Sequence, residues 1–170
     1  ESFFENPVVK EKLKASSVEQ SYYWLDEATK MLCKCRPDFT FGTPENFVAF
    51  DIKTTSFEKK KDLETQILDA GIYIQAAMII DGIKAVDNID VKEFVLIFIQ
   101  KEYPHNVFLK FLDEASIDLG RDMYKNALRQ LKLYYENPAM WQMPEEIGIP
   151  FWAFDKLKGS QYVSISSSGW

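Results

Sequence analysis

Two short acidic motifs most constrain how this chain can fold. The run 47–54 is rich in β-forming residues and predicts a β-strand with Val48, Phe50 and Ile52 on one face. Asp51 and Lys53 then share the other face, roughly 6–7 Å apart. Asp38 lies in an earlier strand-like run, 31–41, and a strong turn signal separates the two runs. A hairpin between them would therefore bring the Asp38 carboxylate alongside that of Asp51.

Two carboxylates and a lysine at one sheet edge are suited to a hard divalent cation. Mg²⁺ takes oxygen ligands and keeps several of its waters, and Lys53 would then lie beside such a water. These groups can hydrolyse a phosphodiester. An ordinary pair of strands with solvated charges would show the same spacing, so spacing alone leaves both interpretations open.

Composition indicates a folded domain. The chain has 170 residues, of which 46% are hydrophobic and 15% aromatic, which excludes a disordered or low-complexity protein. Nothing repeats, so we expect one domain over 1–170, with the motifs in a core of about 17–100. The net charge of −6 is not typical of a nucleic-acid-binding protein, but local clusters of lysine decide such binding more than the total does.

Cysteine usage and hydropathy predict where the protein resides. Cys33 and Cys35 are the only cysteines, too few for a four-cysteine zinc or iron–sulfur site, and we expect both to be reduced thiols. The sequence contains no apolar run of 18 residues and no signal-peptide pattern. It therefore predicts a soluble, cytoplasmic protein that does not associate with a membrane.

The order of the expected elements predicts an α/β fold with a mixed central sheet between helices. Pro37 interrupts the second strand and predicts a bulge or a bend there. The apolar side chains Leu119, Met123, Ala127, Leu131 and Tyr134 are expected on the inner face of the last helix, capped by Ser116 or Asp118. The expected elements are a helix over 6–14, strands over 18–25, 31–41 and 47–54, a helix over 63–83 that stops near Gly82, strands over 93–100 and 107–112, and a helix through 122–135.

Two other features near the middle of the chain bear on the site. Gln75 lies inside the long apolar helix, and a buried amide needs partners, either on a neighbouring strand or at the acidic site itself. Lys59, Lys60 and Lys61 form a basic run directly after the third strand. Such a run is either a solvated face or a set of contacts to phosphates.

These motifs resemble those of the PD-(D/E)XK nuclease superfamily, in which Pro-Asp and Asp-X-Lys lie on the second and third strands of an α-β-β-β-α-β core. The resemblance implies a restriction-endonuclease-like fold. A longer series over about 17–83 resembles the exodeoxyribonuclease VIII (RecE-like) branch of phage and prophage recombination exonucleases. That series consists of Cys-Lys-Cys-Arg-Pro-Asp at 33–38, Phe-Asp-Ile-Lys-Thr-Thr at 50–55, Gln-Ala-Ala at 75–77 and Asp-Gly at 81–82.

The resemblance implies a role for each matching residue. Asp38 and Asp51 would be metal ligands, with the backbone carbonyl of Ile52 as a third. Lys53 would position or deprotonate the attacking water, and Gln75 corresponds to the glutamine that follows the core in this branch. The residues expected to contact DNA are Arg36, Thr54, Lys59, Lys60, Lys61 and Tyr73.

The chain also departs from the pattern of this branch. The branch commonly has tyrosines three residues before and four residues after its glutamine, where this chain has Ile72 and Ile79. It also has a histidine or glutamate on the first helix, and no histidine matches here. Glu11 and Glu19 are the candidates for that upstream carboxylate.

The implied activity is a Mg²⁺- or Mn²⁺-dependent exonuclease that resects double-stranded DNA ends in phage-type recombination. It would work in the cytoplasm of a bacterial or phage-infected cell, with a single-strand annealing protein as partner and a ring-shaped homo-oligomer as its assembly. Two alternatives stay open, a structure-specific or restriction-type endonuclease of the same fold and a catalytically inactive nucleic-acid-binding module. An RNA substrate also stays open, because the acidic site recognises phosphate and not sugar.

Overall fold

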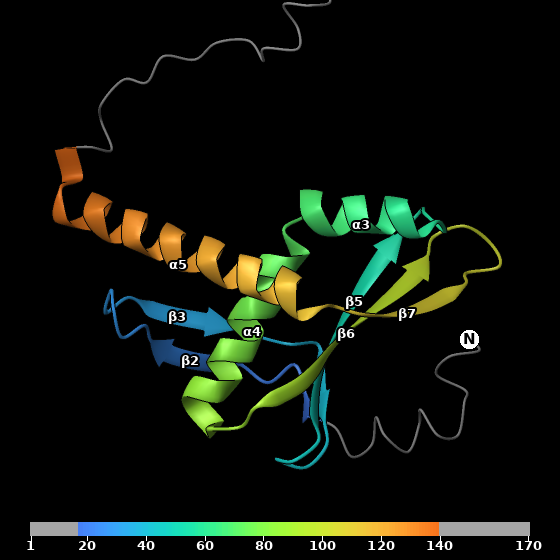
Figure 1. Ribbon diagram of the computed structural model, residues 1–170, viewed down its shortest axis with the longest axis horizontal. Helices are drawn as coiled ribbons and strands as arrows, with labels where there is room; N and C mark the ends of the chain where they lie inside the picture. The colour runs from blue at the N-terminus through green and yellow to red at the C-terminus, as the bar shows by residue number, and fades with distance from the viewer. Residues whose placement is uncertain (1–16, 140–170) are drawn as a thin grey trace, which may run out of the picture. The chain divides into compact units, whose positions relative to one another are not determined.

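A five-stranded mixed sheet forms the centre of the fold (Figure 1). The computed structural model describes residues 17–139. The sheet order is β1-β4-β5-β6-β7, with β5 and β6 parallel and the other neighbours antiparallel. The strands are β1 (Ser17–Val18), β4 (Phe39–Phe41), β5 (Phe47–Thr55), β6 (Val91–Gln100) and β7 (Val107–Phe111). The expected restriction-endonuclease-like α/β class with a mixed sheet is confirmed, and so are the strands expected over 47–54, 93–100 and 107–112.

A second, two-stranded antiparallel sheet consists of β2 (Tyr22–Leu25) and β3 (Leu32–Cys35). Asp26 closes the turn between them, since its Oδ2 accepts hydrogen bonds from the N–H and the hydroxyl of Thr29 at 2.8 and 2.7 Å. Cys33 and Cys35 are both buried free thiols on β3.

Within residues 17–139, three α-helices accompany the strands: α3 (Lys60–Asp69), α4 (Ile72–Asp87) and α5 (Glu114–Glu136). Parallel neighbours such as β5 and β6 cannot be joined by a hairpin, and α3 and α4 supply the required crossover. Asp81 of α4 attaches α5, because its carboxylate accepts hydrogen bonds from Arg121 at 3.0 and 3.1 Å and from Tyr124 at 2.5 Å.

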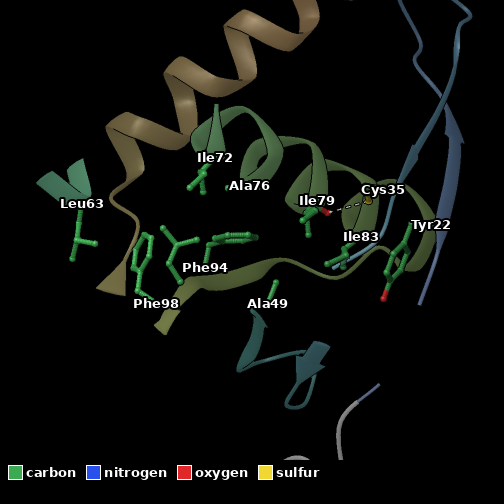
Figure 2. Close-up of a cluster of buried hydrophobic side chains, with 11 residues drawn as sticks. Tyr22, Cys35, Ala49, Leu63, Ile72, Ala76, Ile79, Ile83, Phe94 and Phe98 are labelled. Carbon is green, nitrogen blue, oxygen red and sulfur yellow. Dashed lines mark hydrogen bonds between the residues drawn. The ribbon is translucent and has the colours of Figure 1, made fainter. Parts of the chain in front are cut away.

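The hydrophobic core lies between α4 and the sheet (Figure 2). Apolar side chains of α4 point toward the phenylalanines of β6, as Figure 2 shows for Ile79 and Phe94. Asp51 and Lys53 of β5 are in register with Leu96 and Phe98 of β6, so they share the sheet face that α4 covers. The core residues are Tyr22, Cys35, Ala49, Leu63, Ile72, Ala76, Ile79, Ile83, Phe94, Leu96 and Phe98.

The first two expected strands are each divided. The run 18–25 contributes to β1 and to β2, which belong to different sheets, because the chain turns at Glu19 with a φ of 49°. The run 31–41 becomes β3 and β4, separated at 36–38, where the bend predicted at Pro37 occurs.

The single helix expected over 63–83 is wrong. The chain forms two helices bent by 67°, and the break contains Gly71, whose φ of 63° lies in the left-handed region that glycine adopts readily. Gly82, expected to stop the helix, lies inside α4, where an added Cβ would be 2.6 Å from Trp24 and 2.7 Å from Cys35. Its role is to allow close packing.

The start and the inner face of α5 also differ from the prediction. The helix begins at Glu114, and the side chain of Asp113, rather than Ser116 or Asp118, accepts a hydrogen bond at this end, from the N–H of Ser116 at 2.8 Å. Gly120 and Tyr124 are buried, whereas Leu119 and Met123 are exposed. The buried face is therefore rotated by about one residue from the expected one.

Several expectations lie outside the described residues. The helix over 6–14 and the candidate upstream carboxylate Glu11 are among them, and the single domain over 1–170 stays a prediction. Between residues 17 and 139 no single helix is long and apolar enough to cross a membrane, although the bent pair α3–α4 passes that test by length and composition alone.

Candidate active site

Asp38 joins the two acidic motifs. Pro37 separates β3 from β4, and Asp38 follows immediately, with its Oδ2 accepting a hydrogen bond from the N–H of Ile52 at 2.5 Å. The N–H and C=O of one strand residue point to the same side, so the Ile52 carbonyl also faces the edge at which Asp38 lies. β4 pairs with β5 only as far as Phe50, and this edge beyond it has no strand neighbour among the described residues.

Asp51 is the buried acid of the site. It is only 1% exposed, although its strand face was not expected to be a packed one. Its Oδ1 accepts a hydrogen bond from Gln75 Nε2 at 3.0 Å. Lys53 Nζ lies 2.6 Å from its Oδ2, close enough for strong attraction, although the angles are not those of a hydrogen bond.

Gln75 connects the acid to the lysine. Its Oε1 accepts a hydrogen bond from Lys53 Nζ at 3.0 Å while its Nε2 donates to Asp51. An ammonium only donates and a carboxylate only accepts, so these contacts fix the orientation of the amide. Of the two partners considered for Gln75, a neighbouring strand or the acidic site, the structure shows the acidic site. Gln75 is exposed, however, and not buried as expected.

The electrostatics of the site favour a bound cation. Burial raises the pKa of the Asp51 carboxyl above its ordinary value, and the negative charge of Asp38 acts in the same direction. Lys53 and Gln75 oppose this shift and favour the ionised form. Two neighbouring carboxylates, one of them almost completely buried, gain stability when positive charge lies between them.

The donor set fits a hard divalent ion. Asp38 offers a carboxylate oxygen and Ile52 a carbonyl oxygen at one edge of β5, and Asp51 offers a carboxylate on the adjoining face, where Lys53 already brings a positive charge. Within residues 17–139 no group of three or more histidine, cysteine or acidic side chains is arranged to hold a metal. An ion here would keep several waters, as Mg²⁺ does.

The other residues predicted to contact DNA are distributed around this centre. Arg36 is exposed and lies 3.7 Å from Glu19, whose side chain does not join the acidic pair. Thr54 is exposed on β5. Lys59, Lys60 and Lys61 lie at the start of α3, and Lys60 is within 3.5 Å of Glu64.

Tyr73 has a different environment. It is 9% exposed and lines a cavity of about 280 Å³ between α3, β7 and the start of α5. This position indicates packing, and its contact with DNA stays a prediction.

One polar residue near the site was missed. Gln66 of α3 donates its Nε2 to the carbonyl of Thr54 at 2.9 Å, so helices α3 and α4 each place a glutamine on β5. The Oε1 of Gln66 is buried without a hydrogen-bond partner. No spacing rule could have paired it with Gln75, because the break between the two helices interrupts the periodicity.

Comparison with known proteins agrees with the fold. A family model described as "PDDEXK-like domain of unknown function (DUF3799)" matches residues 2–141. A solved structure named "Putative exonuclease" from Eubacterium rectale is similar with a TM-score of 0.59 and 11% identity over 94% of this chain. This chain spans 63% of that protein's length.

Other comparisons add little. The solved structure of SSO0001 has a TM-score of 0.42 and 18% identity over 76% of this chain and 54% of its own, a similarity too low to carry an argument. No curated protein matches the sequence. The family match covers most of the chain, and the Asp38 carboxylate of the first motif accepts a hydrogen bond from the N–H of Ile52 in the second. The chain therefore belongs to the DUF3799 family of PDDEXK-like domains.

Proposed function

We propose that this protein is a divalent-metal-dependent deoxyribonuclease, an exonuclease that resects double-stranded DNA ends in phage-type recombination. The observation that carries the proposal is the closed set of contacts among Asp51, Lys53 and Gln75 beside the Asp38 carboxylate. The acid and the lysine come from strand β5 and the amide from helix α4, so two elements of one nuclease-like fold hold them together.

Each side chain has a chemical task in this proposal. Asp38 and Asp51, with the carbonyl of Ile52, would hold Mg²⁺ or Mn²⁺, which would supply a polarised water and neutralise charge on the phosphate. The Lys53 ammonium lies next to the same carboxylate, where it can exchange a proton with the attacking water and stabilise charge on the phosphate oxygens.

Gln75 would keep Lys53 in place. Its amide holds the ammonium at 3.0 Å and the Asp51 carboxylate at 3.0 Å, so both reacting groups stay within reach of one phosphate. Positioning of this kind contributes to the rate because misplacement of a reacting group by about 1 Å costs about 100-fold.

Action on DNA ends has separate support. The motif series resembles the RecE-like branch, and the structure from Eubacterium rectale is named "Putative exonuclease". The net charge of −6 favours a DNA path restricted to a small part of the surface, or a channel within a ring of several copies. A single-strand annealing protein as partner and the bacterial or phage-infected cytoplasm as location belong to this same proposal.

Cleavage of linear and covalently closed circular duplex DNA, with and without Mg²⁺, tests the proposal. We expect loss of nucleotides from the linear substrate only, and only with Mg²⁺ or Mn²⁺. Nicking or linearisation of the circle would favour the endonuclease alternative. Binding without cleavage of either DNA would favour the inactive module, and degradation of duplex RNA alone would reassign the substrate.

A further inference from the structure

We propose that the carboxyl ends of β5 and β6 carry a contact surface for unpaired nucleotides, with Phe57 and Tyr103 as the rings on which bases stack. This inference rests on the proposed nuclease function and adds a substrate feature to it, a single-stranded end. The surface, called the aromatic end below, consists of Phe57, Lys59, Lys61, Lys101, Tyr103 and His105.

The aromatic end is one unit, although its two segments, 57–61 and 101–105, are far apart in the sequence. The N–H of Lys101 donates to the carbonyl of Thr55 at 2.8 Å. Gln100, only 7% exposed, donates its amide to Glu58 at 2.8 Å and accepts a hydrogen bond from Asn106 at 3.0 Å. A buried amide with a partner on each segment holds the segment after β5 against the turn after β6.

The turn between β6 and β7 presents its tyrosine outward. The N–H of His105 donates to the carbonyl of Glu102 at 2.8 Å, and its ring nitrogen lies 3.2 Å from the carbonyl of Gln100. The ring of Tyr103 meets that of His105 edge-on, with 6.3 Å between centroids, and Tyr103 remains 89% exposed. Hydrogen bonds thus order the turn while the face of the tyrosine ring stays accessible.

Phe57 supplies a second ring on the neighbouring segment. It is 45% exposed, and its N–H donates to the hydroxyl of Thr55 at 3.0 Å. Burial of apolar surface is favourable, so exposed rings on two hydrogen-bonded segments favour a ligand with flat apolar faces.

The aromatic end lies close to the candidate catalytic groups. Thr55 follows Lys53 by two strand residues, which is roughly 6–7 Å. Figure 1 shows the ends of β5 and β6 and the turn before β7 beside the start of α3. A strand whose phosphate reaches Lys53 would therefore pass the two rings within a few nucleotides.

The charges favour single strands over the outside of a duplex. The segments 57–62 and 101–106 carry four lysines against three carboxylates, Glu58, Asp62 and Glu102, so the aromatic end is not a strongly positive track for a duplex backbone. Rings with a few lysines are instead the combination that binds single strands, because unpaired bases offer flat faces that a duplex conceals. The chemistry therefore points to the unpaired nucleotides at a frayed or resected end.

Fluorescence anisotropy with EDTA present tests the inference on the full chain. The probes are a labelled oligothymidylate, a blunt duplex and a duplex with a single-stranded overhang. Tyr103→Ala and Phe57→Ala should each weaken binding of the oligothymidylate and the overhang by about 5- to 140-fold, since stacking of one base is worth about 1–3 kcal/mol. Binding of the blunt duplex should change less than about twofold.

Tyr135→Ala is the matched control, because Tyr135 is 65% exposed on α5 and lies outside the aromatic end. It should bind all three probes as the unmodified protein does. Unchanged overhang binding by both ring variants would overturn the inference, as would an equal loss on the blunt duplex. Absence of cleavage by the unmodified protein with Mg²⁺ would overturn the proposed function alone, and the anisotropy result would still decide the inference.

Discussion

Lys53 Nζ lies 2.6 Å from the buried Oδ2 of Asp51. The ammonium thus occupies the side of the carboxylate that would otherwise be open to a cation, and Gln75 donates to the other oxygen. A divalent ion that binds Asp51 through Oδ2 must compete with Lys53.

Replacement of Lys53 by methionine should therefore separate ion binding from catalysis. Lys53→Met keeps an unbranched side chain of similar shape but removes the ammonium group, so we expect Mn²⁺ to bind about 10- to 100-fold more tightly, as follows from losing a charged contact of about 1.5–3 kcal/mol. Cleavage should fall by about 100-fold or more. Mn²⁺ titration followed by electron paramagnetic resonance measures the first effect, and weaker Mn²⁺ binding by the variant would contradict the competition.

Gln75→Ala should reduce the rate of cleavage without unfolding the protein. The side chain is exposed, and its loss frees Lys53 from the position it now holds. We expect kcat to fall by about 10- to 100-fold, with little change in KM. Gln130→Ala, at an exposed position of α5, serves as the control. Equal kcat values for the two variants would show that Gln75 does not contribute to catalysis.

Gly120→Ala should destabilise the contact between α5 and α4. A Cβ at Gly120 would lie 2.2 Å from the carbonyl oxygen of Tyr73, which belongs to backbone and cannot rotate away. We expect the free energy of unfolding to fall by about 1–3 kcal/mol in urea denaturation. Asn126→Ala, an exposed α5 position, should change it by less than about 0.5 kcal/mol. A Gly120→Ala variant as stable as this control would contradict the close approach of the helices.

Asp26→Asn should lower the free energy of unfolding at neutral pH, and this effect should disappear in acid. The hydroxyl and N–H of Thr29 lower the pKa of Asp26 below its ordinary value of 3.8. The stabilisation is therefore complete above that ordinary value and is lost as the pH falls through the lower pKa of the folded state. Unfolding measured at pH 7 should show the variant less stable by about 1 kcal/mol, and the difference should shrink toward pH 3. A difference that is constant with pH would contradict the assignment.

The acidic centre could be predicted because it depends on short-range rules. Asp51 and Lys53 are two residues apart on a strand, so they share one face. Pro37 interrupts the preceding strand, and Asp38 then reaches β5 through its contact with Ile52. The burial of Asp51 could not be predicted in this way. It depends on α4, which lies over the strand only because of the break at Gly71.

The misplaced elements share a physical cause. Apolar periodicity continues across 63–83, so only the backbone at Gly71 reveals the bend. For α5, the packing of Gly120 against backbone selects the buried face, and this outweighs the larger apolar side chains of Leu119 and Met123. Tertiary contacts decide in both places, and local patterns do not record them.

The central claim is that Asp38 and Asp51 form a divalent-ion site that cleaves nucleic acid. The most direct test is cleavage of an end-labelled linear duplex over a Mg²⁺ titration. It compares the unmodified protein with the Asp51→Asn variant, in which asparagine keeps the shape of the side chain but not its charge. We predict Mg²⁺-dependent cleavage by the unmodified protein and a loss of about 100-fold or more in the variant, which remains folded by circular dichroism. Equal cleavage by both proteins, or cleavage that persists in EDTA, would contradict the account.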